Sequence, residues 1–311
     1  MLPIQKKPRR ALNGILLLDK PLGLSSNQAL QIVKRLYQAE KAGHTGSLDP
    51  LASGMLPLCF GVATKFSQFL LEANKTYEFS AVLGIKTATG DAEGEVIAQK
   101  EVPPYTLAEL DAACSAFRGQ ISQIPSMYSA VKVDGQALYK LARKGITIDR
   151  PSRQVMIEQL DLLDYEQNTL KMRVTCSKGT YIRTLVEDLG DKLGCGAYVS
   201  QLRRTQVAGL DPKLMVSLPT LEALATDQPL STLDNHLLSL DTALQGFMAV
   251  NLSRTAVHYL QQGQAIALPS VPAQQKWVQL YYNGQFLGMG EVLADGRVMP
   301  SRLLRPKGLV A

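Results

Sequence analysis

The sequence contains no long run of apolar residues. No stretch approaches the roughly 20 consecutive apolar residues that a membrane-spanning helix requires. The basic N-terminus, Met1 to Arg10, is not followed by the hydrophobic stretch of a secretory signal. We therefore expect a cytoplasmic protein that has no membrane partner.

Cysteine and histidine are both scarce. The 311 residues include four cysteines, which form no C-x-x-C pair, and three histidines that stand far apart. A disulfide scaffold requires a denser cysteine pattern, and a zinc site requires a cluster of cysteine or histidine ligands. The sequence therefore predicts buried thiols and no metal site.

The motifs of several nucleotide-processing enzymes are missing as well. We find no G-x-x-x-x-G-K-[ST] phosphate loop and no G-x-G-x-x-G at a strand-to-helix turn. The deaminase pair of H-x-E and P-C-x-x-C is also missing. These absences disfavour nucleotide hydrolysis and deamination.

Apolar and basic residues are plentiful by comparison. Hydrophobic residues make up 46% of the chain, which is ample for a packed core, and the formal net charge of +6 favours a polyanionic partner without identifying one. Six lysines and arginines lie between residues 132 and 153. They form a candidate phosphate-contacting surface, although an ordinary solvated face would have the same charges.

The N-terminal part reads as a strand followed by a helix. Residues 14–19 are a short apolar run that the turn at residues 20–23 must end. Ser25 and Gln28 have the spacing of a capping box, and apolar residues then recur on one helical face as far as Tyr37. From 41 to 65 the pattern has no clean period, so we expect a shaped loop that leads into a helix.

The middle of the chain alternates between strand and helix patterns. Strands are predicted over 77–83, 155–163 and 170–176, and helices over 106–117 and 180–193. Residues 219–245 resemble a helical connector, and the character of the chain changes near 250. A capped helix at 253–262 and hairpin turns at Asn283-Gly284 and Asp295-Gly296 then predict a small, mostly β module.

One acid stands out in the segment from Gly43 to Lys65. Asp49 lies among small and apolar residues, and a partly buried carboxylate requires a cation or hydrogen bonds. Arginine is the best geometric partner, but the residues alone do not say which arginine. Because Pro50 follows, Asp49 could also cap a helix.

Four ordered motifs resemble those of the TruB family, the synthases that make pseudouridine-55 in transfer RNA. The strongest is GSLDPLASGML at 46–56, where Ser47 and Ser53 replace residues that are often threonine in relatives. The others are LDKPLGLSSN at 18–27, IPSMYSAVK at 124–132 and CSKGTYIR at 176–183. The C-terminal module resembles the PUA-like RNA-binding domain of bacterial members.

This resemblance implies a mixed α/β pseudouridine synthase fold, with a central mixed sheet flanked by helices and a PUA-like β module. We expect a catalytic domain over 1–248, with core motifs in 11–210 and a connector at 211–248, and the RNA-binding domain over 249–311. The implied reaction isomerises uridine without redox change or net hydrolysis, so no cofactor is expected.

The resemblance also assigns residues to roles. Asp49 matches the catalytic aspartate, either as a nucleophile at C1′ or as a base in elimination, and Arg183 matches the arginine that pairs with it. Tyr77 matches a tyrosine that stacks on the base and has been considered for proton removal at C5. Further residues matching the substrate pocket are His44, Tyr181 and Leu202. Candidates for contact with the RNA backbone are Lys20, Lys132, Arg143 and Lys144.

The implied partner is the T-arm stem-loop of transfer RNA, bound by a monomer that needs no obligatory protein partner. Two alternatives remain. One is a noncatalytic RNA-binding or RNA-chaperone protein with the same fold. The other is a synthase directed to different RNA, like the archaeal and eukaryotic relatives that are guided by small RNAs within a protein complex.

Overall fold

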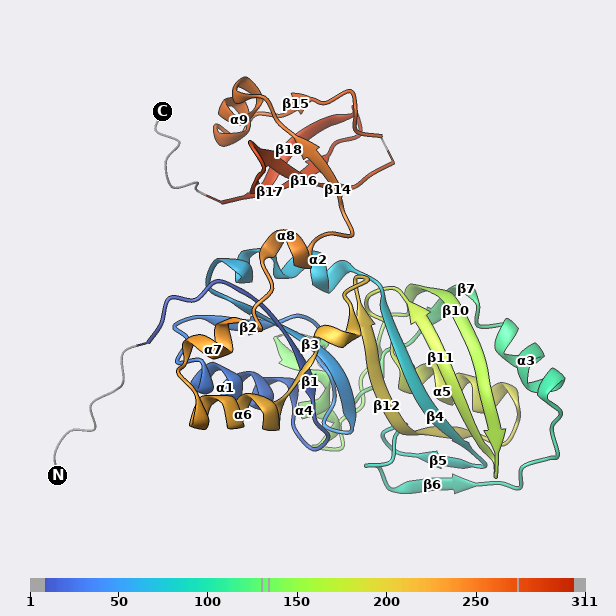
Figure 1. The fold of residues 1–311 in the computed structure, drawn as a ribbon. Helices are drawn as coiled ribbons and strands as arrows, with labels where there is room; N and C mark the ends of the chain where they lie inside the picture. Colours follow the sequence, from blue (N-terminus) through green and yellow to red (C-terminus); the bar gives the residue numbers. More distant parts are fainter. Residues whose placement is uncertain (1–8, 130, 134, 273, 305–311) are drawn as a thin grey trace.

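The computed structural model describes residues 9–129, 131–133, 135–272 and 274–304. A large mixed sheet with helices packed against it forms the first part of the chain, and a smaller sheet forms the last (Figure 1). Within the described residues, no helix is long and apolar enough to cross a membrane. The ends of the two predicted domains at residues 1–8 and 305–311 lie outside the described residues, as does Ala130 of the third motif.

The large sheet has nine strands in the order β13-β1-β3-β12-β4-β11-β10-β7, with β2 paired to β3. Its pairs are antiparallel except for β1 with β13 and β12 with β3, which are parallel, so the sheet is mixed as predicted. The strands are β1 (Gly14–Lys20), β2 (Ala42–His44), β3 (Ala52–Phe60), β4 (Lys75–Leu83), β7 (Gly119–Gln123), β10 (Arg153–Glu166), β11 (Thr169–Cys176), β12 (Ala197–Val207) and β13 (Val216–Ser217).

Helices cover one face of this sheet throughout and the other face only in part. The main core lies beneath α1 (Ser26–Leu36), α3 (Leu107–Ser115), α5 (Ile182–Lys192), α6 (Leu218–Asp227) and α7 (Ser231–Asp234). On the opposite face a second core covers β1 and β3 beneath η1 (Gly61–Phe66), α2 (Ser67–Glu72) and α8 (Leu240–Ala243). Beyond β12 that face is open, and β4 alternates buried and half-buried residues along its length (Figure 1).

Shorter elements complete the first part of the chain. They are the hairpin of β5 (Ile85–Thr87) and β6 (Val96–Gln99), the two-residue strands β8 (Lys132–Val133) and β9 (Gln136–Ala137), the helix α4 (Leu138–Ala142) and the 3-10 turn η2 (Pro212–Leu214). All four cysteines are buried and free, as predicted.

Several local predictions are confirmed. The capping box forms at the start of α1, where the Gln28 amide N–H donates to Ser25 Oγ and the Gln28 side chain accepts from the Ser25 backbone. The helix predicted from residue 180 is α5, which ends at Lys192 with Gly194 in the left-handed region beyond it. The strands predicted near 77, 155 and 170 are β4, β10 and β11.

Several strands were not predicted, and the two longest of them are β3 and β12. The segment 41–65, which we expected to be a loop leading into a helix, contains β3, and β12 was not predicted at all. Because β3 lies in the middle of the sheet and is buried on both faces, its sequence lacks the alternation that identifies a half-exposed strand. The same finding excludes Asp49 as a helix cap, since β3 follows it.

The last part of the chain is a five-stranded sheet in the order β14-β16-β17-β18-β15. Its elements are β14 (Met248–Asn251), α9 (Arg254–Gln261), β15 (Ile266–Ala267), β16 (Trp277–Tyr282), β17 (Gln285–Val292) and β18 (Arg297–Leu303). The two predicted hairpin turns join β16 to β17 and β17 to β18. β14 spans the predicted boundary at 248–249, and the independence of the two domains stays a prediction.

Candidate active site

Asp49 lies in the turn between β2 and β3 and faces two cavities. One cavity, of about 270 Å³, lies between this turn, β4, β12 and the start of α5. The other, of about 670 Å³, extends from the turn toward α4. The Asp49 side chain is 44% exposed, so its carboxylate is accessible from both.

The backbone on each side of Asp49 is fixed by the turn that leads into α1. Leu48 N donates to the buried Ser26 Oγ at 2.6 Å, and the hydroxyl donates to Leu48 O at 3.0 Å. On the other side, Gly23 N donates to Pro50 O at 2.8 Å. The first and second motifs of the chain therefore meet here, and together they position the carboxylate.

Arg183 is the arginine that pairs with Asp49. It lies in the first turn of α5, is 5% exposed, and places Nη2 at 2.9 Å from Asp49 Oδ2. Its Nη1 lies at 3.0 Å from Asp91 Oδ2. The guanidinium also donates to the carbonyls of Tyr128 and Thr89, so it is held on both edges.

Asp91 was not predicted. It lies in the turn between β5 and β6, and its side chain is 3% exposed. Its Oδ1 accepts from the hydroxyl of Thr89 and from Glu93 N, while Oδ2 accepts from Arg183. A polar, glycine-containing turn gives no indication of this role in the sequence, because the contact to α5 is purely tertiary.

The charges around Asp49 act on its pKa in opposite directions. Burial raises the pKa of the Asp49 carboxyl above its ordinary value, and the neighbouring carboxylate of Asp91 raises it further. The cations Arg183 and Lys20 lower the pKa but do not reverse the shift. Asp49 is therefore a more basic carboxylate than an ordinary aspartate, and a cation still favours its ionised form.

Three residues predicted for the pocket line the smaller cavity together with Asp49: Tyr77, Tyr181 and Leu202. Tyr77 on β4 and Leu202 on β12 are 9% and 8% exposed. Tyr181 precedes α5, and its backbone is held by the buried Gln123, whose Oε1 accepts from Tyr181 N at 3.0 Å. The structure thus brings two aromatic rings to the cavity that the carboxylate faces.

Arg204 is a second residue that was not predicted. It is 1% exposed, and it donates from Nε to Met55 O at 2.7 Å and from Nη2 to Gly46 O at 3.0 Å. It lines the cavity and lies beside Tyr77, whose pKa burial raises and Arg204 only partly lowers. Tyr77 is therefore a neutral phenol at neutral pH.

His44 lines the larger cavity, together with Asp49 and Arg183. Its pKa is lowered by burial and by the charge of Arg204, so the imidazole is neutral at neutral pH. Its Nδ1 is buried and has no hydrogen-bond partner among the described residues. A polar atom placed in this way at a cavity can bond to a ligand that enters it.

The residues predicted to contact the RNA backbone differ in how exposed they are. Lys20 is fully buried, and its ammonium donates to Pro21 O and Leu24 O, so it does not reach the surface that we predicted for it. The side chain of Lys132 lies outside the described residues. Arg143 and Lys144 are exposed after α4, and Arg143 lines the larger cavity.

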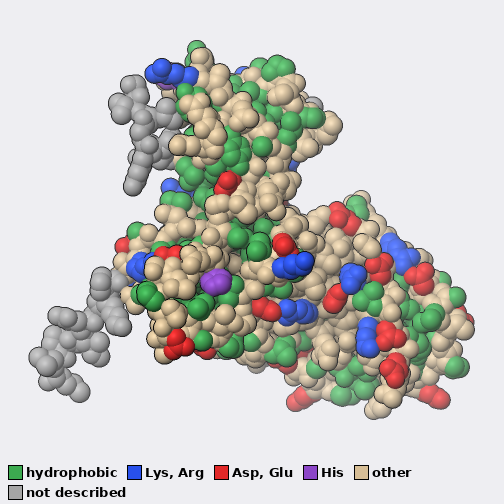
Figure 2. Space-filling view, viewed as in Figure 1, with side chains coloured by type: hydrophobic (Ala, Val, Ile, Leu, Met, Phe, Trp, Pro, Cys, Tyr) green, Lys and Arg blue, Asp and Glu red, His purple; other side chains and the backbone are tan. Residues whose placement is uncertain are grey.

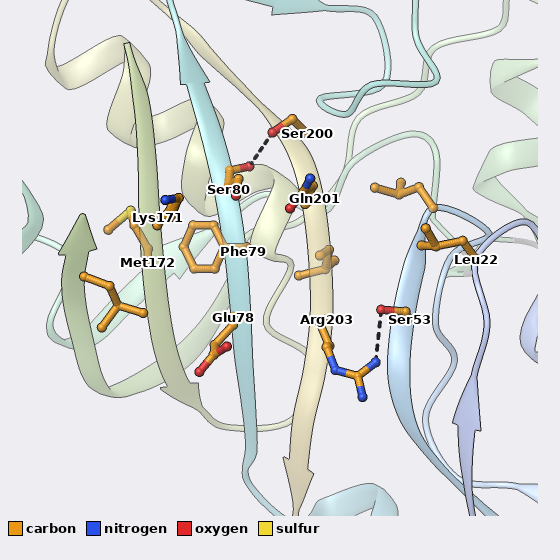
Figure 3. Close-up of a pocket in the computed structure, with 13 residues that line it drawn as sticks. Leu22, Ser53, Glu78, Phe79, Ser80, Lys171, Met172, Ser200, Gln201 and Arg203 are labelled. Atoms are coloured by element: carbon orange, nitrogen blue, oxygen red, sulfur yellow. Dashed lines mark hydrogen bonds between the residues drawn. The ribbon is translucent and has the colours of Figure 1, made fainter. Parts of the chain in front are cut away.

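A third hollow, of about 520 Å³, lies on the open face of the sheet. Figure 3 shows Glu78, Lys171 and Arg203 around it, with dashed bonds from Ser200 to Ser80 and from Arg203 to Ser53. Each of the three charged residues is in an ion pair, with partners Arg173, Asp164 and Asp19. Among the described residues, no cluster of three or more His, Cys, Asp or Glu could hold a metal.

Family models match most of the chain. The model described as TruB family pseudouridylate synthase (N terminal domain) matches residues 34–182. Those described as tRNA pseudouridylate synthase B C-terminal domain and as Pseudouridine synthase II TruB, C-terminal match 183–245 and 249–304. This chain belongs to the TruB family.

Curated relatives agree with this membership. The chain is 51% identical over 300 residues to the tRNA pseudouridine synthase B of Coxiella burnetii strain RSA 493, which covers 96% of this chain and 97% of the relative. It is 52% identical over 302 residues to the protein of the same name from Pseudomonas fluorescens strain Pf0-1, with 96% and 98% covered. The TruB-family chain is a pseudouridine synthase, which excludes RNA binding as its sole role.

Solved structures share its fold. A chain of a Cbf5-Nop10-Gar1 complex superposes with a TM-score of 0.72 at 23% identity, covering 94% of this chain and 84% of that one. A chain of an H/ACA RNP bound to a substrate RNA containing 2′-deoxyuridine gives 0.71 at 21% identity, covering 95% and 86%. With the family models, these likenesses confirm the predicted pseudouridine synthase fold and its C-terminal PUA-like sheet.

Proposed function

We propose that this TruB-family enzyme converts uridine 55 in the T-arm loop of transfer RNA to pseudouridine, with Asp49 as the catalytic carboxylate. One observation carries the assignment of Asp49. Of the two carboxylates that share Arg183, Asp91 is 3% exposed and lines only the larger cavity, whereas Asp49 is 44% exposed and lines both. A ribose in the smaller cavity, beside Tyr77 and Tyr181, can therefore reach Asp49, whereas Asp91 does not line that cavity.

The reaction balances within the substrate itself. The bond between N1 and C1′ of the ribose breaks, the uracil turns, and C5 forms the new bond to C1′ while the C5 proton is lost and N1 gains one. An ionised Asp49 can act as the nucleophile at C1′ or as the base of an elimination. Both routes require its negative charge, which Arg183 favours.

The cavity beside Asp49 suits a flipped base. Tyr77 and Tyr181 offer two rings, and stacking on an aromatic ring contributes about 1–3 kcal/mol per base. Extruding a base from a folded RNA loop costs a few kcal/mol, which such stacking offsets in large part. Arg153 lies 5.6 Å from the centre of the Tyr181 ring and stabilises its position by a cation–π contact.

The distribution of charge supports RNA entry from the side of α4. Arg143 lines the larger cavity and lies 5.6 Å from the ring centre of Tyr139. On the open face of the sheet, by contrast, Figure 2 shows basic and acidic side chains next to one another, in keeping with the ion pairs there. Phosphate groups can pair with Arg143, whereas Lys171 and Arg173 on the open face are already paired with acids.

We further propose that the enzyme acts as a monomer, without a guide RNA or an obligatory protein partner, and meets its transfer RNA in the cytoplasm. The high identity to bacterial proteins named tRNA pseudouridine synthase B supports this. The test is to incubate the purified chain alone with an unmodified transfer RNA and to map pseudouridine by position. We expect product at uridine 55; product at another uridine, or none without added factors, would contradict the proposal.

A further inference from the structure

The C-terminal sheet rests on the catalytic part through a cluster of aromatic side chains. The ring of Phe66 in η1 lies 6.0 Å from that of Phe286 in β17. The ring of Phe69 in α2 lies 5.1 Å from that of Trp277 in β16, in an edge-to-face arrangement. Phe66 and Phe69 are almost fully buried, and so is Met289 of β17 in the same cluster. This contact fixes α2 from the outside.

The other end of α2 is held by a buried lysine. Lys75, the first residue of β4, is 6% exposed. Its ammonium donates to the carbonyls of Leu70 at 3.1 Å and Leu71 at 2.7 Å, and to that of Ala73. These carbonyls belong to the last turn of α2 and the residue after it, where a positive charge is favoured.

Lys75 and Leu71 also form one wall of the cavity that Asp49 faces. Tyr77 is two residues beyond Lys75 on β4, so both side chains point to the same face of the strand. The aromatic cluster therefore contacts α2, α2 contacts Lys75, and Lys75 and the predicted base-stacking ring line the same cavity from one strand.

We propose that Lys75 is a positioning residue, and that the C-terminal module, by packing on α2, supports the wall of the catalytic pocket. This inference rests on the proposed active site. A change at the aromatic contact moves α2, the ammonium of Lys75 follows its carbonyl partners, and the β4 side of the pocket shifts. The module then contributes to the rate of the chemical step as well as to RNA binding.

The charges near Lys75 agree with this role. Burial and the charge of Arg204 lower its pKa, the thiol of Cys176 and Glu72 raise it, and the net pKa is about 8. Lys178 faces the same ammonium and lowers the pKa slightly. At neutral pH the amine is mainly protonated, so it can donate to all three carbonyls at once.

The experiment uses the full chain with Phe286→Ala, which removes the ring contact to Phe66 in η1 and substitutes no residue of the active site. We expect the single-turnover rate at saturating RNA to fall roughly tenfold while the Kd for RNA stays within about twofold. The matched control is Val278→Ala, a fully buried residue of the module's own core, which should leave the rate unchanged. A normal rate in Phe286→Ala, or an equal loss in the control, would overturn the inference.

A double-mutant cycle tests the route through Lys75. If Phe286→Ala and Lys75→Met act through the same helix, the double variant should be about as slow as the slower single variant. If the two rate losses multiply instead, the route through Lys75 is wrong. Should Lys75→Met fail to fold, Leu71→Ala, at a residue that is 41% exposed, replaces it in the cycle. Activity of Asp49→Asn would refute the proposed site separately.

Discussion

The guanidinium of Arg183 lies 2.9 Å from the carboxylate of Asp49 and approaches it from inside the protein. Its opposite edge is occupied by Asp91, so one buried cation serves two carboxylates. Asp91, whose side chain is 3% exposed, compensates the charge of Arg183, and the more exposed Asp49 can interact with substrate. The two acids therefore differ in what their removal should do, although both contact the same arginine.

Asp49→Asn keeps the size of the side chain and removes its charge. Arg183 retains Asp91 as a counter-ion, and Asp49 is 44% exposed, so the free energy of unfolding should change by less than about 1 kcal/mol. RNA affinity should persist, because phosphate contacts and stacking supply most of it. We expect no detectable pseudouridine with enzyme in excess over RNA, measured beside a denaturation curve. Substantial product from protein free of host enzyme would refute the catalytic assignment.

Asp91→Asn should affect both stability and turnover. Removing one partner of a buried ion pair costs about 3–5 kcal/mol, and we expect the lower end because Asp49 remains beside Arg183. The freed edge of the guanidinium lets Asp49 shift, so turnover should fall on the order of 100-fold. Asp188→Asn, on the helix α5 that carries Arg183, is the matched control. Wild-type single-turnover rates in Asp91→Asn would show that Asp49 alone positions Arg183.

As the pH is lowered, activity should begin to fall at a higher pH than an ordinary aspartate would give. Burial raises the pKa of Asp49 above its ordinary value of 3.8, so the carboxylate becomes protonated as the pH falls through that raised pKa, and activity is lost there. Single-turnover rates at saturating RNA across the acid range measure this. The pKa of His44 is lowered below 6.5, so His44→Asn is the control. The loss of activity at acid pH should persist in this variant. A midpoint at or below 3.8 would contradict the raised pKa.

Sequence patterns predicted the parts of the site that lie within continuous motifs. Asp49 is recognisable because one acid stands among small and apolar residues, whereas only the resemblance to the TruB family singled out Arg183 among the arginines. Strand β4 alternates cleanly, since one face is open, and this placed Tyr77 in the sheet. Local physical rules and the TruB resemblance both singled out Asp49.

The remaining parts depend on contacts that the linear sequence does not show. Asp91 is separated from Arg183 by 92 residues, and Arg204 lies on a strand that we did not predict. Lys20 illustrates the opposite error, because a lysine beside a turn is normally exposed, whereas here the side chain is buried and donates to the carbonyls of Pro21 and Leu24. Burial of a charge is decided by tertiary partners, which no local pattern encodes.

Tyr77→Phe should separate binding from chemistry. The ring stays to stack on the base, so the Kd for RNA should remain within about twofold of wild type. Burial raises the pKa of Tyr77 and keeps the phenol neutral, so its hydroxyl can take part in proton movement at C5 or bond to the uracil. We expect a turnover loss of about 100-fold or more, within the range for a lost acid–base group. Full turnover in this variant would leave Tyr77 as a stacking surface only.

Two basic residues on different surfaces should respond differently to neutralisation. Arg143 is exposed at the rim of the larger cavity, whereas Lys171 lies on the open face of the sheet and is paired with Asp164 at 2.7 Å. Each phosphate contact contributes about 0.9 to the slope of log K against log salt. Arg143→Gln should therefore weaken RNA binding and reduce that slope by about 0.9, while Lys171→Gln should change neither. Because both substitutions remove one positive charge, the net charge of the two variants is equal, and any difference between them reports position alone. Equal effects would mean that RNA binding depends on overall charge. A larger effect of Lys171→Gln would indicate that RNA binds to the open face of the sheet.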